Sequence, residues 1–223
     1  MMKDETLVVL YEDNHILAIE KPPGLLSQKD YTQDLDVTEL AKRYLKEKYN
    51  KPGDVYLGLV HRLDRPVGGV MILAKTSKAA SRLSHDIRNR DFHKTYLALV
   101  EGEVKEEGTI ELMLKKDEET RTMHVDEDGK NSLLTYRPID FLDHKTLLEI
   151  DLLTGRFHQI RISLSSMGHP IVNDEKYHAK KTRKNDPLYL WCSHIAFRHP
   201  VSKEWVDVVS NPHHWPILIK KAL

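Results

Sequence analysis

The chain has 223 residues, of which 40% are hydrophobic and 30% charged, and its 34 basic side chains balance 34 acidic ones. This composition excludes a disordered or collagen-like chain, and the length suffices for a substantial hydrophobic core. A neutral chain does not bind nucleic acid through its overall charge, so any RNA site must come from local patches.

The sequence also predicts the cellular setting. No apolar run approaches the ~18 residues that span a bilayer, and the charged start gives no sign of a signal peptide. The single cysteine, Cys192, cannot form an internal disulfide. We therefore expect a cytoplasmic protein in a reducing compartment, without a membrane partner. The sequence does not indicate an oligomeric state, and a monomer is the default expectation.

Short apolar runs separated by polar or glycine-containing turns predict most of the strands. In chain order they are residues 7–11, 16–19, 56–60, 70–74, 94–100 and 146–153, with two more flanking the Asp-Gly turn at 126–129. The run at 70–74 is apolar enough for burial on both faces. The Asp-Gly dipeptide is a strong hairpin signal.

Three helices are expected between these strands. The first starts at the N-cap Asp36, with Glu39 completing a capping box, and ends near residues 50–53. The second is capped by Ser77 and runs to about residue 90. The third follows Gly155. Strands outnumber helices and strict alternation is missing, which predicts one α+β domain over residues 1–223 with a largely antiparallel sheet.

Asp64 is the first candidate for chemistry, because it lies in a polar loop between two apolar strands, with Arg62 and Arg65 close by. Nearby cations favour the ionised carboxylate. The alternative is an aspartate that pairs with an arginine and satisfies loop amides. The following Gly68-Gly69 indicates a tight turn rather than a phosphate cradle.

The segment Thr154–Arg161 is the second candidate. It leaves a strand at a glycine and begins a helix with two arginines, Arg156 and Arg161, which could bind phosphate or carboxylate through two parallel hydrogen bonds. The alternative is a solvated surface. Tyr96 could stack on a base or lie in the core, and Lys21 could be functional or a surface charge.

Two runs of positive charge suit local contacts to an RNA backbone, although a single run is usually a solvated surface. They are Lys75, Lys78, Arg82, Arg88, Arg90 and Lys94, and Lys176, Lys180, Lys181, Arg183 and Lys184. No metal-ligand spacing occurs among the histidines, so we expect no metal.

Four motifs, in order, resemble those of the RluA-type pseudouridine synthases. They are Lys21-Pro22-Pro23-Gly24, His61-Arg62-Leu63-Asp64, Lys94-Thr95-Tyr96, and Thr154–Arg161 followed by Gly168-His169-Pro170-Ile171. The resemblance covers nearly the whole chain. It implies conversion of uridine to pseudouridine in RNA without a cofactor or metal, and a fold with a mixed, largely antiparallel sheet, flanking helices and a catalytic cleft.

The resemblance also implies a role for each matching residue. Asp64 would be the catalytic aspartate, Tyr96 the ring that stacks on the target base, and Arg161 the arginine that pairs with the aspartate. Ile160 would lie beneath the base. The implied substrate-binding residues are Lys21, Arg62, Arg156, His158, Ile160, Lys180, Lys181 and Arg183.

The chain departs from the family in two ways. Val67-Gly68-Gly69 stands where relatives often have Thr-Ser-Gly, so two hydroxyls are lost. A first strand beginning by Leu7 leaves no room for the N-terminal S4 RNA-binding domain of many relatives, so we expect the short form.

Two other functions stay open from the sequence. A nucleoside glycosidase would need a second catalytic carboxylate, for which Glu20 and Asp91 are candidates. A non-catalytic RNA clamp or chaperone would have no use for Asp64, Tyr96 and Arg161 together. The RNA itself, transfer or ribosomal, is not indicated.

Overall fold

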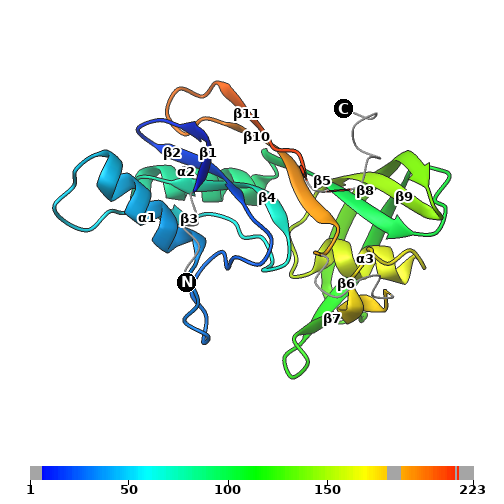
Figure 1. Ribbon diagram of the computed structural model, residues 1–223. Helices are drawn as coiled ribbons and strands as arrows, with labels where there is room; N and C mark the ends of the chain where they lie inside the picture. The colour runs from blue at the N-terminus through cyan, green and yellow to red at the C-terminus, as the bar shows by residue number, and fades with distance from the viewer. Residues whose placement is uncertain (1–6, 180–186, 214, 216–223) are drawn as a thin grey trace. The chain divides into compact units, whose positions relative to one another are not determined.

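The computed structural model describes residues 7–179, 187–213 and 215 (Figure 1). The chain forms two compact units. Unit 1 is built from Met1–Phe92 and His194–Asn211, and unit 2 from His93–Ser193 and Pro212–Leu223. Strand β10 (Leu190–Arg198) therefore begins in unit 2 and ends in unit 1.

Unit 1 contains a sheet in the order β1-β2-β4-β10, with β3 paired to β4 and β11 to β10. The other strands of this sheet are β1 (Val8–Glu12), β2 (Ile16–Lys21), β3 (Gly58–Leu59), β4 (Gly68–Ala74) and β11 (Trp205–Val209). The β1–β2, β2–β4, β3–β4 and β10–β11 pairs are antiparallel. The strand predicted at 56–60 is reduced to the two residues of β3.

The centre of unit 1 is the β2–β4 pair, whose register sets Ile16 opposite Ala74 and Lys21 opposite Gly69. All residues of 16–19 and 70–74 are fully buried. Burial of the run at 70–74 on both faces, predicted from its composition, is therefore confirmed. This register brings the end of β2 next to the start of β4, which directly follows the loop that contains Asp64.

The helices of unit 1 begin as helix-capping rules require, with two corrections. Asp36 caps α1 (Val37–Lys48) by accepting a hydrogen bond from the Glu39 N–H at 2.9 Å. The carboxylate of Glu39 pairs with Lys29 and Arg43, in place of the return hydrogen bond that a capping box requires. The N-cap of α2 (Ser77–Asn89) is Thr76 rather than Ser77.

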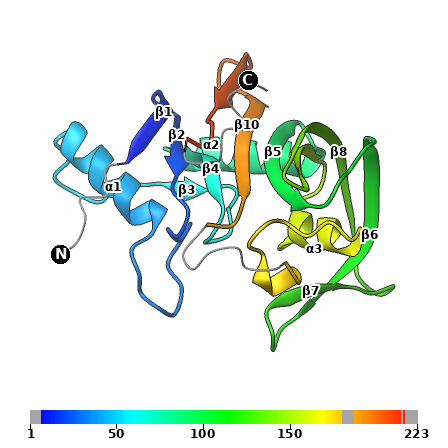
Figure 2. The same ribbon diagram turned by 45° about the vertical axis from the view of Figure 1, so that its right-hand side comes forward.

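Unit 2 has a sheet in the order β10-β5-β9-β8-β6-β7. Its further elements are β5 (Phe92–Glu101), β6 (Gly108–Asp117), β7 (Thr122–Val125), β8 (Lys130–Leu142), β9 (Lys145–Leu152), α3 (Gln159–Ser166) and the 3₁₀ turn η1 (Glu175–Tyr177). Figures 1 and 2 both show α3 beside η1 and β7. A cluster around Trp191, with Leu97 and Leu147, forms part of its core.

The turn at 126–129 is not the hairpin that the Asp-Gly dipeptide predicts. β7 and β8 both pair with β6, on opposite sides of it, so the turn carries the chain across that strand. The crossing is close, because a Cβ at Gly129 would lie 2.6 Å from the backbone of Leu114. Glycine is therefore required here by contact with a strand rather than by hairpin geometry.

The mostly antiparallel pairing and the three helices of the described residues confirm the α+β class. The longest of these helices, α2, has 13 residues. None of the described helices has the length and apolar character needed to cross a membrane.

Glu12 connects several elements of unit 1. Its carboxylate, whose side chain is 6% exposed, accepts hydrogen bonds from Tyr44 at 2.8 Å, Lys48 at 2.7 Å, Tyr49 at 2.7 Å and Lys75 at 2.7 Å. Burial alone would raise the pKa of Glu12, but these donors outweigh it and lower the pKa to about 2. The end of β1 is thereby joined to α1 and to the segment that follows β4.

Because the folded pKa of Glu12 lies below its ordinary value, its contribution to stability is present above pH ~4.5 and is lost as the pH falls towards 2. Glu12→Gln should lower the free energy of unfolding by about 2–3 kcal/mol at neutral pH. It should also flatten the dependence of the urea midpoint on pH in that window. Glu47→Gln, at an exposed position of α1, is the control. Equal urea midpoints for the two variants would contradict this assignment.

Candidate active site

Asp64 lies in the loop between β3 and β4, and its side chain is half-buried. The residue before it is held at both backbone groups by Ser27, whose hydroxyl donates to the Leu63 carbonyl at 2.6 Å and accepts from the Leu63 N–H at 3.1 Å. The Asp64 carbonyl accepts from the Val67 N–H at 3.0 Å, which closes the turn. The loop is therefore fixed on both sides of the carboxylate.

Lys21, at the end of β2, holds the same loop through a hydrogen bond to its backbone. Its side chain is fully buried, and its ammonium donates to the carbonyls of Pro22 at 3.0 Å, Leu25 at 2.7 Å and Arg65 at 3.1 Å. These acceptors use all three N–H groups of the ammonium. Lys21 is thus not the surface charge that the sequence left open.

The electrostatics of Lys21 involve Asp64 directly. Burial lowers the pKa of Lys21 to about 7; the negative charge of Asp64 opposes this shift, and the positive charge of Arg65 adds to it. The structure therefore brings together two of the residues predicted from separate motifs, Lys21 and Asp64. The negative charge of Asp64 favours the protonated form of Lys21.

The two arginines that flank Asp64 have different surroundings. Arg65 donates to the Gly24 carbonyl at 3.0 Å and to Asp34 at 2.8 Å, so its charge is used within unit 1. Arg62 is exposed. Glu20, one of the carboxylates considered for a glycosidase, accepts from the Ser210 hydroxyl at 2.6 Å.

The glycines after Asp64 begin a strand. The turn lies at Arg65-Pro66, and both Gly68 and Gly69 are buried residues of β4. Gly69 has a φ of +114°, in a region that other residues rarely adopt, and it pairs with Lys21. Position 69 therefore needs glycine, whereas the turn expected at 68–69 lies earlier.

Tyr96 lies in β5 of unit 2 and is 5% exposed. Its hydroxyl forms a hydrogen bond with the Cys192 thiol of β10. Burial raises the pKa of Cys192 to about 12, against the opposing effects of Tyr96 and the nearby positive charge of Lys94. Burial also lowers the pKa of Lys94. Lys94 and Tyr96 stand two residues apart in one strand and therefore share a face of it.

Arg161, on α3, is a buried charge rather than a solvated one. Its guanidinium forms two hydrogen bonds with the carboxylate of Asp174, and it lies over the ring of Tyr177. His158 is also buried and bonds the Tyr177 hydroxyl at 2.9 Å. Burial, then the charges of Arg161 and Lys176, lower the pKa of His158 to about 3, so its imidazole is neutral at pH 7.

The remaining predicted residues fall into three groups. Ile160 is 4% exposed and belongs to the core side of α3. Arg156 is exposed and donates to the Asn131 carbonyl at 2.9 Å. Three positions, Lys180, Lys181 and Arg183, together with Lys184, lie outside the described residues.

The basic run on α2 is only partly available to a ligand. Arg82 donates to the Pro200 carbonyl at 2.7 Å, and Lys75 is paired with Glu12. Lys78, Arg88 and Arg90 are exposed.

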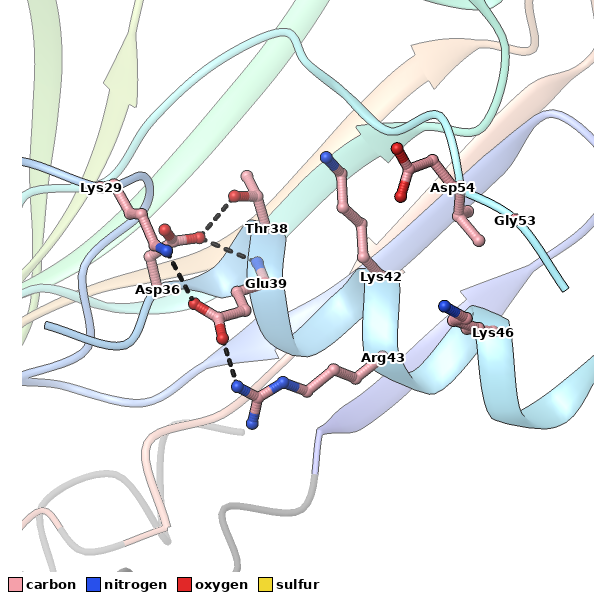
Figure 3. A pocket seen from close by; sticks show the side chains of 10 residues that line it. Lys29, Asp36, Thr38, Glu39, Lys42, Arg43, Lys46, Gly53 and Asp54 are labelled. Atoms are coloured by element: carbon pink, nitrogen blue, oxygen red, sulfur yellow. Dashed lines mark hydrogen bonds and ion pairs between the residues drawn. The ribbon is translucent and has the colours of Figure 1, made fainter. Parts of the chain in front are cut away.

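A cavity of about 350 Å³ opens beside α1, and the residues that line it are not among those predicted for the site (Figure 3). Its charged lining comprises Lys29, Lys42, Arg43, Lys46, Asp36, Glu39 and Asp54. Because Glu39 pairs with Lys29 and Arg43, and the charges are nearly balanced, we assign no polyanion to it. Within the described parts of the chain, no three His, Cys, Asp or Glu side chains are grouped as metal ligands.

The sequence missed three residues that hold the predicted ones in place. Ser27 and Asp174 carry no periodic signal, and only the contacts reveal them. Tyr177 lies within the basic run 176–184 of the sequence, but it is 3% exposed and contacts Arg161. The position of Asp174, four residues after the Gly-His-Pro of the last motif, was the one available hint.

The sequence of this chain is similar to a family of RNA-modifying enzymes and to several of its members. A sequence model of the RNA pseudouridylate synthase family matches residues 15–166. The dual-specificity RNA pseudouridine synthase RluA of Vibrio parahaemolyticus is 34% identical over 213 residues, which cover 92% of this chain and 82% of that protein. The ribosomal large subunit pseudouridine synthase C of the same organism is 31% identical over 208 residues; the match covers 90% of this chain and only 64% of that protein.

The chain therefore belongs to the RNA pseudouridylate synthase family, and the resemblance predicted from its four motifs is confirmed. The class of enzyme is an RNA pseudouridine synthase, an isomerase. Among solved structures, human RNA pseudouridylate synthase domain containing 1 superimposes with a TM-score of 0.78 at 24% identity, over 98% of this chain and 88% of that one. This similarity confirms the pseudouridine synthase fold.

Lys21→Met tests the anchoring of the Asp64 loop. The variant keeps the length of the side chain but removes the donor to three carbonyls, so we expect the free energy of unfolding to fall by about 2–4 kcal/mol. Lys29→Met is the control, because Lys29 is 54% exposed and forms a surface ion pair worth at most about 1 kcal/mol. Urea unfolding measures both. A loss no larger than that of the control would refute the anchoring role.

Proposed function

We propose that this chain isomerises specific uridines in ribosomal or transfer RNA to pseudouridine, with Asp64 as the catalytic aspartate. The observation that carries the proposal is the fixed loop around Asp64, in a chain whose residues 15–166 match the RNA pseudouridylate synthase family. The named relatives act on large-subunit ribosomal RNA or are dual-specific RNA enzymes, which supports an RNA substrate of either class.

The reaction breaks the bond between C1′ and N1, turns the base and joins C1′ to C5. A carboxylate serves this reaction in one of two ways. It attacks C1′ as a nucleophile, or it removes the 2′ proton so that a glycal forms. Tyr96 stacks on the target base in this proposal. Arg161 stabilises the negative charge of Asp64, which would be costly alone in a water-poor site.

The remaining proposed residues contact the RNA. A uridine within a duplex is unreachable, so the enzyme flips it out, which is least costly in single-stranded loops. Ile160 lies beneath the base and His158 beside it, while Lys21 keeps the loop in place. Arg62, Arg156, Lys180, Lys181 and Arg183 supply phosphate contacts. We propose that residues 1–223 work as one catalytic domain, as a monomer in the cytoplasm.

Release of tritium from RNA labelled at uridine C5 tests the activity, because C5 exchanges its hydrogen for C1′ during the isomerisation. We expect release from unmodified transfer or ribosomal transcripts, and a loss of about a thousand-fold or more in Asp64→Asn. Asp54→Asn makes the same change of charge elsewhere in unit 1 and should retain the activity.

The other functions give different outcomes in the same assay. Free uracil in place of pseudouridine would indicate a nucleoside glycosidase. RNA binding without tritium release, unaffected by Asp64→Asn, would indicate a clamp or chaperone.

Salt dependence tests how the RNA is held. If cationic side chains neutralise phosphates, the logarithm of the binding constant falls linearly with the logarithm of salt concentration. Arg62→Gln should weaken binding and reduce that slope by about one phosphate contact. The comparison is Lys46→Gln, at an exposed position of α1 that belongs to neither basic run. Binding that is insensitive to salt would count against a phosphate-contacting surface.

A further inference from the structure

Asp174 forms a buried ion pair with Arg161. The exposed fractions of the two side chains are 1% and 7%, and the carboxylate accepts from Nε at 2.8 Å and from Nη2 at 2.6 Å. Two parallel bonds fix both the position and the plane of a guanidinium. A single contact would leave it free to rotate.

The carboxylate is itself held by a tight turn. The Asp174 N–H donates to the Ile171 carbonyl at 2.9 Å, and the Asp174 carbonyl accepts from the N–H groups of Tyr177 at 2.9 Å and Ala179 at 3.1 Å. Asp174 therefore has little freedom to move towards or away from α3. Rigid support of this kind is what a precisely placed polar group needs.

Tyr177 covers one face of the same guanidinium, with Arg161 Cζ 5.1 Å from the ring centroid. Its hydroxyl accepts from the Met123 N–H of β7 at 2.8 Å and forms a hydrogen bond with His158, the N-cap residue of α3, at 2.9 Å. The ring is thereby tied to two other elements. The hydrogen bonds from Asp174 fix the guanidinium of Arg161 within its plane. The ring of Tyr177 packs on one face of that plane.

We propose that Asp174 is a positioning residue for pseudouridine formation, acting through Arg161. This inference rests on the proposed function. Asp174 takes the Nε–H and one Nη2–H of the five guanidinium donors, so three remain for other partners. Their directions are set by the pair with Asp174. Stability alone does not account for the pair, because well-packed apolar residues commonly replace a buried ion pair without loss.

Asp174→Glu is the variant of choice, because it keeps the charge and moves the carboxylate by one methylene. Glu149→Asp is its matched control, because it also moves a carboxylate that pairs with an arginine in unit 2. Glu149 Oε1 lies 2.7 Å from Nη2 of Arg137, whose side chain is 57% exposed. Asp174→Asn leaves a buried guanidinium without its counter-charge and can unfold the chain, so melting temperatures accompany every variant.

The kinetic readout separates positioning from folding. With saturating enzyme and C5-tritiated transcripts, we expect the single-turnover rate of Asp174→Glu to fall about 10- to 100-fold. The dissociation constant for the same RNA should stay within about twofold. In an Arg161→Lys background, the same change should add less than about twofold, since both act through one group.

A second readout does not need activity. The ¹⁵Nε–H resonance of Arg161, assigned by its loss in Arg161→Lys, should exchange slowly in the native protein and fast in Asp174→Glu. If the native protein releases tritium and Asp174→Glu keeps its rate, or loses rate only in proportion to its folded fraction, the positioning role is overturned. If the native protein releases none from any RNA, the proposed function fails first, and the role in that reaction with it.

Discussion

A buried ammonium at the end of β2 is the constraint on which the Asp64 loop depends. The ammonium of Lys21 is held by three backbone carbonyls, two from the segment after β2 and one from the loop of Asp64. Carbonyl dipoles stabilise the positive charge without cancelling it. Burial lowers the pKa of Lys21 to about 7, and the negative charge of Asp64 acts against this shift.

The buried charge of Arg161, a second candidate residue, is stabilised by a different physical means. Its counter-charge is the carboxylate of Asp174, which accepts hydrogen bonds from two of its donors. The difference follows from the two side chains. An ammonium is a point charge that three carbonyls can surround, whereas a planar guanidinium is oriented best by a forked carboxylate. Backbone carbonyls thus fix the position of Lys21, and the carboxylate of Asp174 fixes the position of Arg161.

The sequence predicted most of the strands and the starts of the helices because those depend on local signals. The buried run of β4 and the N-cap Asp36 are examples. Prediction from the sequence failed where contacts between residues far apart in the chain determine the local structure. Glycine is needed at position 129 because the chain passes close to β6 there and not because of a hairpin, and the pairing of β6 with both β7 and β8 has no local signature. Among candidate site residues, the motifs found Asp64, Tyr96 and Arg161, whereas Ser27 and Asp174 required the fold.

The same contacts bear on the two hydroxyls that this chain lacks after Asp64. Ser27 satisfies both backbone groups of Leu63, and the Arg65 carbonyl accepts from Lys21 and from the Gly24 N–H at 2.8 Å. Val67, where relatives often have threonine, is 3% exposed and anchors the turn through burial. The backbone around Asp64 therefore has hydrogen-bond partners in Ser27, Lys21 and the N–H groups of Gly24 and Val67, none of which is a side-chain hydroxyl at position 67 or 68.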